Sequence, residues 1–351
     1  MASLALVALA CNNAQQSDSP SSDASVFDSG RTAYGFFPVP PEATLDSVFQ
    51  LFDDMRDHGD FVLIQHNTNW LDFVNGGEGE SQTRTDLANQ VELARSRNLD
   101  YIFVADALNG LNRTEFVGLP DGWEASFANP DVRRAYRNHV LWIVETFAPR
   151  YLGLGSEINT YMDAHPEDAP NFVSLYNEIY ALVKAQSPTT QVFVSFQWED
   201  LNNVVPQPGE GDREKFVPNW DEVEAFEPNL DLWVISTYPY VVFDDGADIP
   251  ADYYTPLLSR TDKPLAIAEG GFSSQPVGST HSTAAGQAAY LETVHAQLGS
   301  RLAFWTNTLL NDFAVTTDDP GLGVFAHSGL RESDGSAKPA LAIWDAFRTG
   351  G

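Results

Sequence analysis

The feature that most constrains the fold is a regular alternation between short apolar runs and longer amphipathic stretches. Eight runs rich in β-branched or aromatic residues begin near residues 33, 61, 101, 151, 192, 232, 265 and 302. Each is followed by a candidate helix, over residues 43–58, 83–98, 131–147, 171–186, 220–226, 252–260, 284–299 and 339–349. Near-continuous apolar runs are typical of parallel strands that are covered on both faces. The pattern predicts an α/β fold, a single-domain (β/α)₈ TIM barrel. An open doubly wound sheet is the alternative, which the lack of a GxGxxG or GxxxxGK[ST] loop after the first run disfavours.

Residues 1–30 precede this alternation, so the barrel is expected to span residues 31–351. The segment MASLALVALAC ends at Cys11 and is followed by a stretch rich in Ser and Asp. It resembles the end of a bacterial lipoprotein signal, which predicts a lipidated Cys11 and a flexible tether up to residue 30. A trimmed chain and an ordinary signal peptide are the alternatives. We therefore expect a secreted, periplasmic or outer-surface protein, which a lipid on Cys11 would anchor.

The charge balance excludes some classes of partner. The chain has 49 Asp and Glu residues against 19 Lys and Arg residues, a formal net charge of −30. Such a field repels nucleic acids and anionic membranes and favours a neutral or cationic ligand. No protein partner is evident, and Cys11 is the one cysteine, so no intrachain disulfide can form.

Polar and aromatic residues follow the predicted strands at their carboxyl ends, where the site of a (β/α)₈ barrel forms. The candidate substrate-binding residues are His66, Asn67, Trp70, Asp106, Asn159, Gln197, Trp198, Tyr238, Tyr240, Trp305 and Asn307. Amides and histidine bind hydroxyl groups, and aromatic faces stack on sugar rings. The set contains no Lys or Arg for a phosphate, and neither a Ser/His/Asp triad nor a metal-ligand spacing is evident. We therefore expect a carbohydrate site without a metal or cofactor.

Two glutamates end predicted strands that lie nearly opposite each other in such a barrel. Glu157 follows the fourth apolar run, in YLGLGSEINTY, and Glu269 ends the seventh, in KPLAIAEGGF. Carboxylates reaching inward from these positions can approach to about 5–5.5 Å, the separation used by retaining glycosidases. One acid then attacks the anomeric carbon while the other gives its proton to the leaving oxygen and later activates water.

With these residues in place, the chain resembles the clan A glycoside hydrolases, a superfamily of retaining (β/α)₈ enzymes. Its second half is similar to the arabinogalactan endo-β-1,4-galactanases around ISTYPY (235–240) and KPLAIAEGGF (263–272). The resemblance implies that Glu157 is the acid/base and Glu269 the nucleophile. It also implies that Tyr238 or Tyr240 contacts the nucleophile and that Trp305 lies under the sugar at the scissile bond.

The chain departs from the clan at two places next to these glutamates. Most members have Asn before the acid/base, where it binds the sugar 2-hydroxyl, but this chain has Ser156. Asn159 or a side chain of the fifth strand is a candidate replacement. Gly270-Gly271 stands where Thr-Gly often follows the nucleophile.

The sequence predicts a retaining endo-β-glycosidase that hydrolyses a neutral β-linked polysaccharide or oligosaccharide. Galactan, mannan and β-glucan remain open as substrates, and the loss of Asn at position 156 favours a sugar read differently at carbon 2, such as mannose. One alternative is a non-catalytic glycan-binding barrel at the cell surface. Another is an esterase-like open α/β enzyme, although Ser156, Ser195 and Ser236 lack the flanks of a GxSxG elbow.

Overall fold

The computed structural model describes residues 25–76, 81–205, 213–314 and 320–350. Within them, nine parallel strand segments form one sheet in the order β7-β6-β3-β2-β1-β11-β10-β9-β8. The segments are β1 (Ala33–Phe36), β2 (Phe61–Asn67), β3 (Asp100–Asp106), β6 (Tyr151–Gly153), β7 (Gln191–Phe193), β8 (Ser195–Gln197), β9 (Trp233–Thr237), β10 (Leu265–Gly270) and β11 (Leu302–Asn307). β7 and β8 are two halves of one apolar run interrupted at Val194, and they pair with β6 and β9 respectively. The sheet therefore closes into a ring of eight strands, which confirms the predicted barrel.

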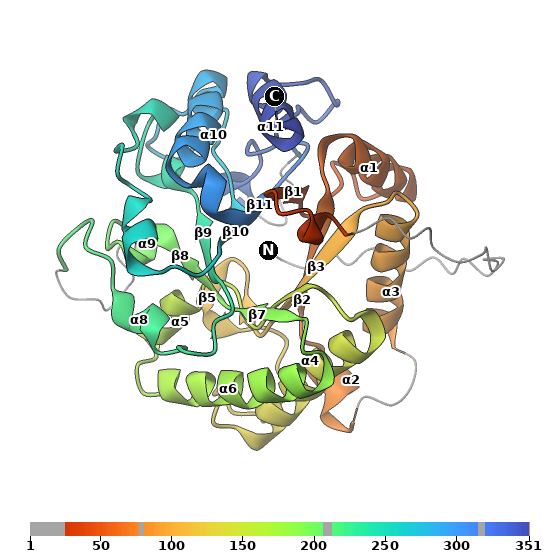
Figure 1. Ribbon diagram of the computed structural model, residues 1–351. Coiled ribbons are helices and arrows are strands. Elements are labelled where there is room, and N and C mark those ends of the chain that lie inside the picture. The colour runs from red at the N-terminus through yellow and green to blue at the C-terminus, as the bar shows by residue number, and fades with distance from the viewer. Residues whose placement is uncertain (1–24, 77–80, 206–212, 315–319, 351) are drawn as a thin grey trace.

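Helices surround this ring (Figure 1). They are α1 (Leu45–His58), α3 (Gln82–Arg95), α4 (Pro130–Phe147), α6 (Ala169–Gln186), α8 (Trp220–Glu224), α9 (Thr255–Arg260), α10 (Ala284–Leu298) and α11 (Pro339–Thr349). Side-chain oxygens of Thr44, Ser81, Asn129 and Thr283 accept backbone N–H bonds at the starts of α1, α3, α4 and α10. These caps satisfy N–H groups that the first helical turn leaves unpaired, so they define where the helices begin.

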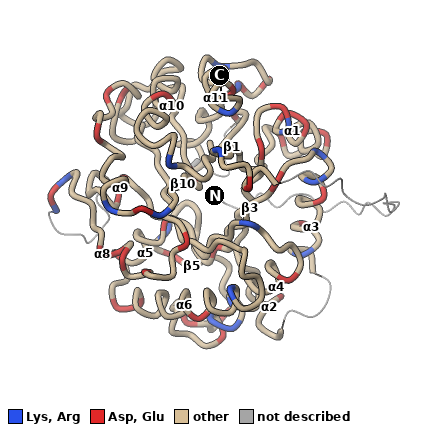
Figure 2. Tube along the Cα trace, viewed as in Figure 1, with Lys and Arg blue, Asp and Glu red and all other residues tan. Residues whose placement is uncertain are grey.

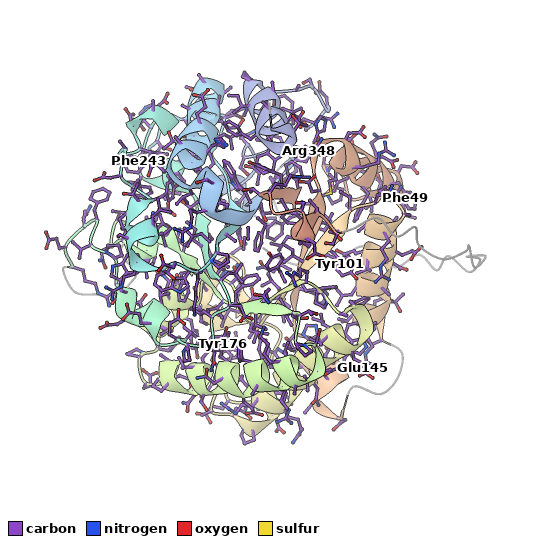
Figure 3. The ribbon with its side chains drawn as sticks, in the orientation of Figure 1. Phe49, Tyr101, Glu145, Tyr176, Phe243 and Arg348 are labelled. Carbon is purple, nitrogen blue, oxygen red and sulfur yellow. The ribbon has the colours of Figure 1, made fainter. Side chains whose placement is uncertain are left out.

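The strands bury both of their faces. Alternate residues, among them Phe61, Ile102, Val234 and Phe304, form an inner cluster within the ring. The residues between them form a larger cluster with the helices, and Tyr176 of α6 (labelled in Figure 3) belongs to it. The barrel centre is thus a packed core, and polar side chains are left for its carboxyl-terminal end.

The amino-terminal end of the barrel is closed by a short 3₁₀ segment, Val26–Asp28. Phe27 packs edge-on against Tyr151 and near Phe61, and the backbone N–H of Val26 donates to Asp100. Residues 26–28 therefore pack against the amino-terminal end of the barrel, just before the predicted boundary at residue 31. The expected lipidation site, Cys11, lies outside the described residues.

Acidic residues are spread over the outer helices and loops, with fewer basic residues between them (Figure 2). In the described part of the chain, no helix is both long and apolar enough to cross a membrane.

Several short elements of the described residues were not predicted, and four of them lie beside the expected site. They are helices α2 (Trp70–Val74), α5 (Ile158–Ala164) and α7 (Trp198–Leu201), and the antiparallel hairpin of β4 (Leu108–Asn109) and β5 (Asn112–Phe116). All four follow the carboxyl ends of β2, β3, β6 or β8, so they lie at the end of the barrel where the candidate site was expected.

Candidate active site

Glu157 and Glu269 both lie at the carboxyl-terminal end of the barrel and are largely buried. Glu157 follows β6 and is the residue before α5, with a left-handed backbone (φ 52°) that non-glycine residues seldom adopt. Glu269 is the fifth residue of β10, where the pairing register with β9 shifts. They are 8% and 3% exposed respectively. Left-handed backbone at a buried acid is typical of functional sites, where strain is tolerated to place a side chain.

One arginine connects the two glutamates. Arg113 of β5 donates from Nε to Glu157 Oε2 at 2.9 Å, and its Nη2 lies 3.7 Å from Glu269 Oε2. Nε and Nη2 are on the same edge of the guanidinium, so both carboxylates face one edge of one cation. The structure therefore brings the two predicted acids together and adds a basic residue, whereas the sequence analysis expected none in the site.

Arg113 is held from its other side by Asp106. Its Nη1 donates to Asp106 Oδ2 at 2.5 Å, and that carboxylate also accepts from Gln65 Nε2 and from the Leu108 backbone N–H. Asp106, predicted to bind substrate, is 1% exposed and instead anchors the arginine.

Hydroxyl groups complete the surroundings of each carboxylate. Ser236 Oγ donates to Glu157 Oε1 at 2.6 Å. Tyr238 OH donates to Glu269 Oε1 at 2.7 Å, as predicted for one of the two tyrosines, and lies 2.7 Å from Thr308 Oγ1. Ser156 Oγ is 3.4 Å from Glu269 Oε2.

Burial and charge set the protonation of this cluster. Burial and the neighbouring Glu157 carboxylate raise the pKa of Glu269, while Arg113 and the Tyr238 hydroxyl oppose that rise. Burial and the Glu269 charge raise the pKa of Tyr238 well above its ordinary value, so the phenol keeps the proton that it donates. Burial disfavours the charged guanidinium of Arg113, but the charges of Asp106, Glu157 and Glu269 outweigh burial and raise its pKa.

Most of the predicted aromatic contacts are instead core residues. Trp70, Trp198, Tyr240 and Trp305 are each at most 1% exposed. The Trp70 indole donates to the Val117 carbonyl and the Tyr240 hydroxyl to the Val324 carbonyl, and Trp198 stacks on Tyr254. None of the four offers a free ring face, which corrects the expectation that they stack on substrate.

Trp305 shows the physical reason most clearly. Its neighbours Ala303 and Phe304 pack with the inner cluster, whereas Trp305 packs against Tyr34 and Trp344 in the layer between the barrel and α11. The indole therefore lies outside the barrel ring and does not lie beneath a sugar at the glutamates.

Trp305→Ala should accordingly destabilise the fold and leave the chemistry of the folded fraction unchanged. Replacing a fully buried tryptophan by alanine costs about 3–5 kcal/mol of unfolding free energy. Urea denaturation measures the cost, and activity per folded molecule measures the chemistry. A stable variant with much reduced activity per folded molecule would show that Trp305 does act in the site.

The predicted polar residues divide in a similar way. Asn159 is fully buried; it accepts from the Gln197 N–H and donates to the Gln197 carbonyl and Asp200, so it joins α5 to β8. Its amide is thus already engaged within the protein, which gives no support to the suggestion that Asn159 replaces the missing asparagine contact. Gln197 begins α7 by accepting from the Asp200 N–H, and it donates to Glu199.

The remaining three candidates also make local contacts. His66 Nδ1 is 2.6 Å from the Asn67 carbonyl, and burial lowers the pKa of this imidazole. Asn67 donates to the Leu108 carbonyl at the start of the hairpin. Asn307 is 1% exposed and donates to the Leu309 and Ser328 carbonyls. None of the three has a hydrogen bond to either glutamate among the described residues.

The three serines at strand ends contact the glutamates or each other. Ser195 Oγ accepts from the Glu157 backbone N–H and lies 3.2 Å from Ser156 Oγ, while Ser236 donates to Glu157 as above. Their hydrogen bonds in the described part of the chain involve no histidine, so the geometry gives no support to an esterase-type serine. No group of three or more His, Cys, Asp or Glu among the described residues is arranged to hold a metal ion.

Comparison with known proteins supports the barrel fold. No protein-family model matches the chain, and no curated protein sequence does. Solved structures do match. The exo-β-1,4-mannosidase of Opitutaceae bacterium strain TAV5 is 14% identical with a TM-score of 0.68, over 91% of this chain and 59% of the mannosidase. This chain thus spans less than two thirds of the mannosidase.

This chain matches a larger share of two further solved structures. A GH5_18 protein from Bifidobacterium longum subsp. longum is 14% identical with a TM-score of 0.65, over 91% of this chain and 79% of that one. The GH53 catalytic domain of Ignisphaera aggregans is 15% identical with a TM-score of 0.55, over 89% and 90%. At these identities the likeness is one of fold alone, the (β/α)₈ TIM barrel.

Proposed function

We propose that this protein is a retaining β-glycosidase that works by double displacement between Glu157 and Glu269. The observation that carries the proposal is the pair of buried glutamates facing one edge of the Arg113 guanidinium, at 2.9 Å and 3.7 Å. Two acids on adjacent nitrogens of one cation are close together, which suits the short separation of retaining enzymes better than the wider one that leaves room for water in inverting enzymes.

In the first half of the reaction, Glu269 attacks the anomeric carbon as a carboxylate and Glu157 gives its proton to the leaving oxygen. In the second half, Glu157 takes a proton from water, and the water oxygen displaces Glu269 from the sugar. Tyr238 orients the Glu269 carboxylate and stabilises its negative charge through the 2.7 Å hydrogen bond that it donates.

A neutral β-linked glycan is the proposed substrate class, with mannan, galactan and β-glucan as candidates. The fold neighbours include an exo-β-1,4-mannosidase and a GH53 domain, and the second suits the galactanase resemblance around ISTYPY. Ser156 in place of the usual asparagine favours a manno-configured sugar, since the contact at carbon 2 must be made differently.

The burial of the acids bears on the mode of attack. Glu157 and Glu269 are at most 8% exposed. Acids buried to this degree suit reaction at a chain end, which makes exo action a second candidate beside the endo action expected from the sequence.

A panel of β-mannan, β-galactan and β-glucan, with product sizing at early times, tests the proposal. A monosaccharide alone at early times indicates exo action, and a ladder of oligosaccharides indicates endo action. Proton NMR of the first product should show the β-anomer before mutarotation. An initial α-anomer would contradict the retaining mechanism, and inactivity on every β-glycan would favour the alternative of a non-catalytic glycan-binding barrel.

Tyr238→Phe should reduce kcat/KM by about 10- to 100-fold, the range expected for a lost hydrogen bond to a charged group. The hydroxyl lowers the pKa of Glu269, and its removal leaves that pKa higher still. Because Glu269 must be ionised to attack, the acidic limb of the kcat/KM profile should move to higher pH.

Tyr176→Phe is the matched control, since it removes a buried hydroxyl that donates to the Asn229 carbonyl on the helical side. It should leave the pH profile unchanged. An unshifted acidic limb in Tyr238→Phe would contradict the role given to this hydroxyl.

A further inference from the structure

The hydrogen bonds of Arg113 are distributed unusually. In an ordinary arginine–carboxylate pair, Nε and Nη2 hold the two oxygens of one carboxylate. Here Nε donates to Glu157, while Nη2 is 3.7 Å from Glu269 and makes no hydrogen bond among the described residues. One edge of the cation is therefore divided between two acids.

The proposed mechanism moves charge between those two acids. At the start Glu269 is ionised and Glu157 is protonated. When the Glu269 oxygen bonds to the anomeric carbon, the glycosidic bond breaks and the proton of Glu157 passes to the leaving oxygen. Glu269 is then a neutral ester and Glu157 carries the negative charge. Attack by water reverses this, so one unit of charge crosses to Glu157 and returns in each turnover.

We propose that Arg113 is a positioning residue that stabilises this charge on whichever glutamate carries it, so that one cation supports both half-reactions. The inference rests on the proposed function and adds to it a basic residue on the hairpin β4–β5.

The surroundings of Arg113 suit this role. Its side chain is 5% exposed, where solvent screens charges weakly. Asp106 holds Nη1 on the far side, which keeps the Nε and Nη2 edge turned toward the two acids. Since Nη2 makes no hydrogen bond in the described structure, a small shift toward Glu269 breaks none at that atom.

In the described structure the guanidinium lies nearer one of the two acids. Both oxygens of Glu157 accept hydrogen bonds, from Arg113 and from Ser236. Glu269 Oε2 is 3.7 Å from Nη2 of Arg113, and Glu269 Oε1 accepts from Tyr238. Stabilising the charge on Glu269 therefore requires only a small shift of Nη2 toward that acid.

Arg113→Met and Arg113→Lys test the inference on two aryl β-glycosides. With a poor leaving group glycosylation limits the rate, and with 2,4-dinitrophenolate as leaving group deglycosylation limits it. Arg113→Met should slow both steps, each by about 10²- to 10³-fold, the usual cost of removing one preorganised charge-stabilising donor. Arg113→Lys retains a charge but cannot face both acids, so it should slow both steps by less.

The pH profile separates this role from general structural support. Arg113 lowers the pKa of Glu269, so the acidic limb of kcat/KM should move to higher pH in Arg113→Met and much less in Arg113→Lys. Arg137→Met is the matched control, because Arg137 pairs with Glu178 between α4 and α6. It should leave both rates and the limb unchanged.

The inference would be overturned if Arg113→Met slowed only one of the two half-reactions. It would also be overturned if a folded Arg113→Met kept the acidic limb of the kcat/KM profile at its wild-type pH. If Arg113→Met does not fold, the test depends on Arg113→Lys. Wild-type rates for both half-reactions in Arg113→Lys would overturn the inference. Inactivity of the wild-type protein on all glycans would count against the proposed function instead. In that case NMR titration of ¹³C-labelled glutamate carboxyls still tests the role of Arg113. The pH at which Glu269 is half ionised should be higher in Arg113→Met than in the wild-type protein, and an unchanged value contradicts the inference.

Discussion

Glu269→Ala should reduce turnover of every glycoside by at least about 10⁴-fold, because it removes the group that forms the covalent intermediate. A good leaving group should not rescue the variant, since the missing step is attack on the anomeric carbon and not protonation of the leaving oxygen. Steady-state rates with aryl glycosides of graded leaving-group acidity measure this.

Azide distinguishes the loss of a nucleophile from a general loss of structure. The alanine side chain leaves space beside Tyr238, and an azide ion entering there attacks the face that Glu269 attacked. Glu157 still protonates the leaving oxygen, so a β-glycoside should give the α-glycosyl azide. Glu178→Ala, on α6, removes a carboxylate that pairs with Arg133 and Arg137, and it should retain full activity. Normal activity in Glu269→Ala would mean that this acid is structural.

The strands of the barrel could be predicted because their signal is local. Each apolar run in the sequence became a strand within a residue or two of its expected start, and α1, α3, α4 and α10 begin at capping side chains. Glu157 and Glu269 could be placed at the same end of the barrel because parallel strands align their carboxyl ends.

Which strand side chains point into the barrel and which point toward the helices could not be predicted in the same way. In a sheet covered on both faces the residues on each face are apolar, so the pattern does not tell inner from outer positions. Trp305 and Phe304 are both large and buried, yet they lie on opposite faces of β11. Register shifts beside β10 add to the difficulty, since they change which residues point inward.

Arg113 was missed because a non-local contact gives it its role. The segment from Asn109 to Asn112 carries a turn signal, Asn109-Gly110, that favours a short hairpin. A hairpin prediction would have placed Arg113 near the strand ends. Nothing local to the hairpin would have shown that it folds back over two glutamates that lie 44 and 156 positions later in the chain.

Glu157→Ala should lose activity selectively, in proportion to the protonation that the leaving group needs. General acid–base catalysis contributes about 10²- to 10⁴-fold, so glycosides with poor leaving groups should lose that much. With 2,4-dinitrophenolate as leaving group the first step needs no proton, and the glycosyl-enzyme should form and accumulate as an initial burst. Its breakdown should be slow because no base activates water.

Azide also tests the role of Glu157, and the glycosyl azide should have the opposite anomeric configuration to the one from Glu269→Ala. It needs no general base, so it should attack the accumulated glycosyl-enzyme on Glu269, restore turnover and yield the β-glycosyl azide. The contacts of Glu157 make this the decisive experiment, because Arg113 and Ser236 both donate to it as they would to an ionised carboxylate. If Glu157→Ala gives the α-azide and Glu269→Ala the β-azide, Glu157 is the nucleophile and Glu269, whose pKa burial raises, is the acid. The β-azide from Glu157→Ala would instead support Glu157 as the acid/base. The hydrogen bonds that Glu157 accepts from Arg113 and Ser236 would then correspond to its ionised form, after it has given its proton to the leaving oxygen.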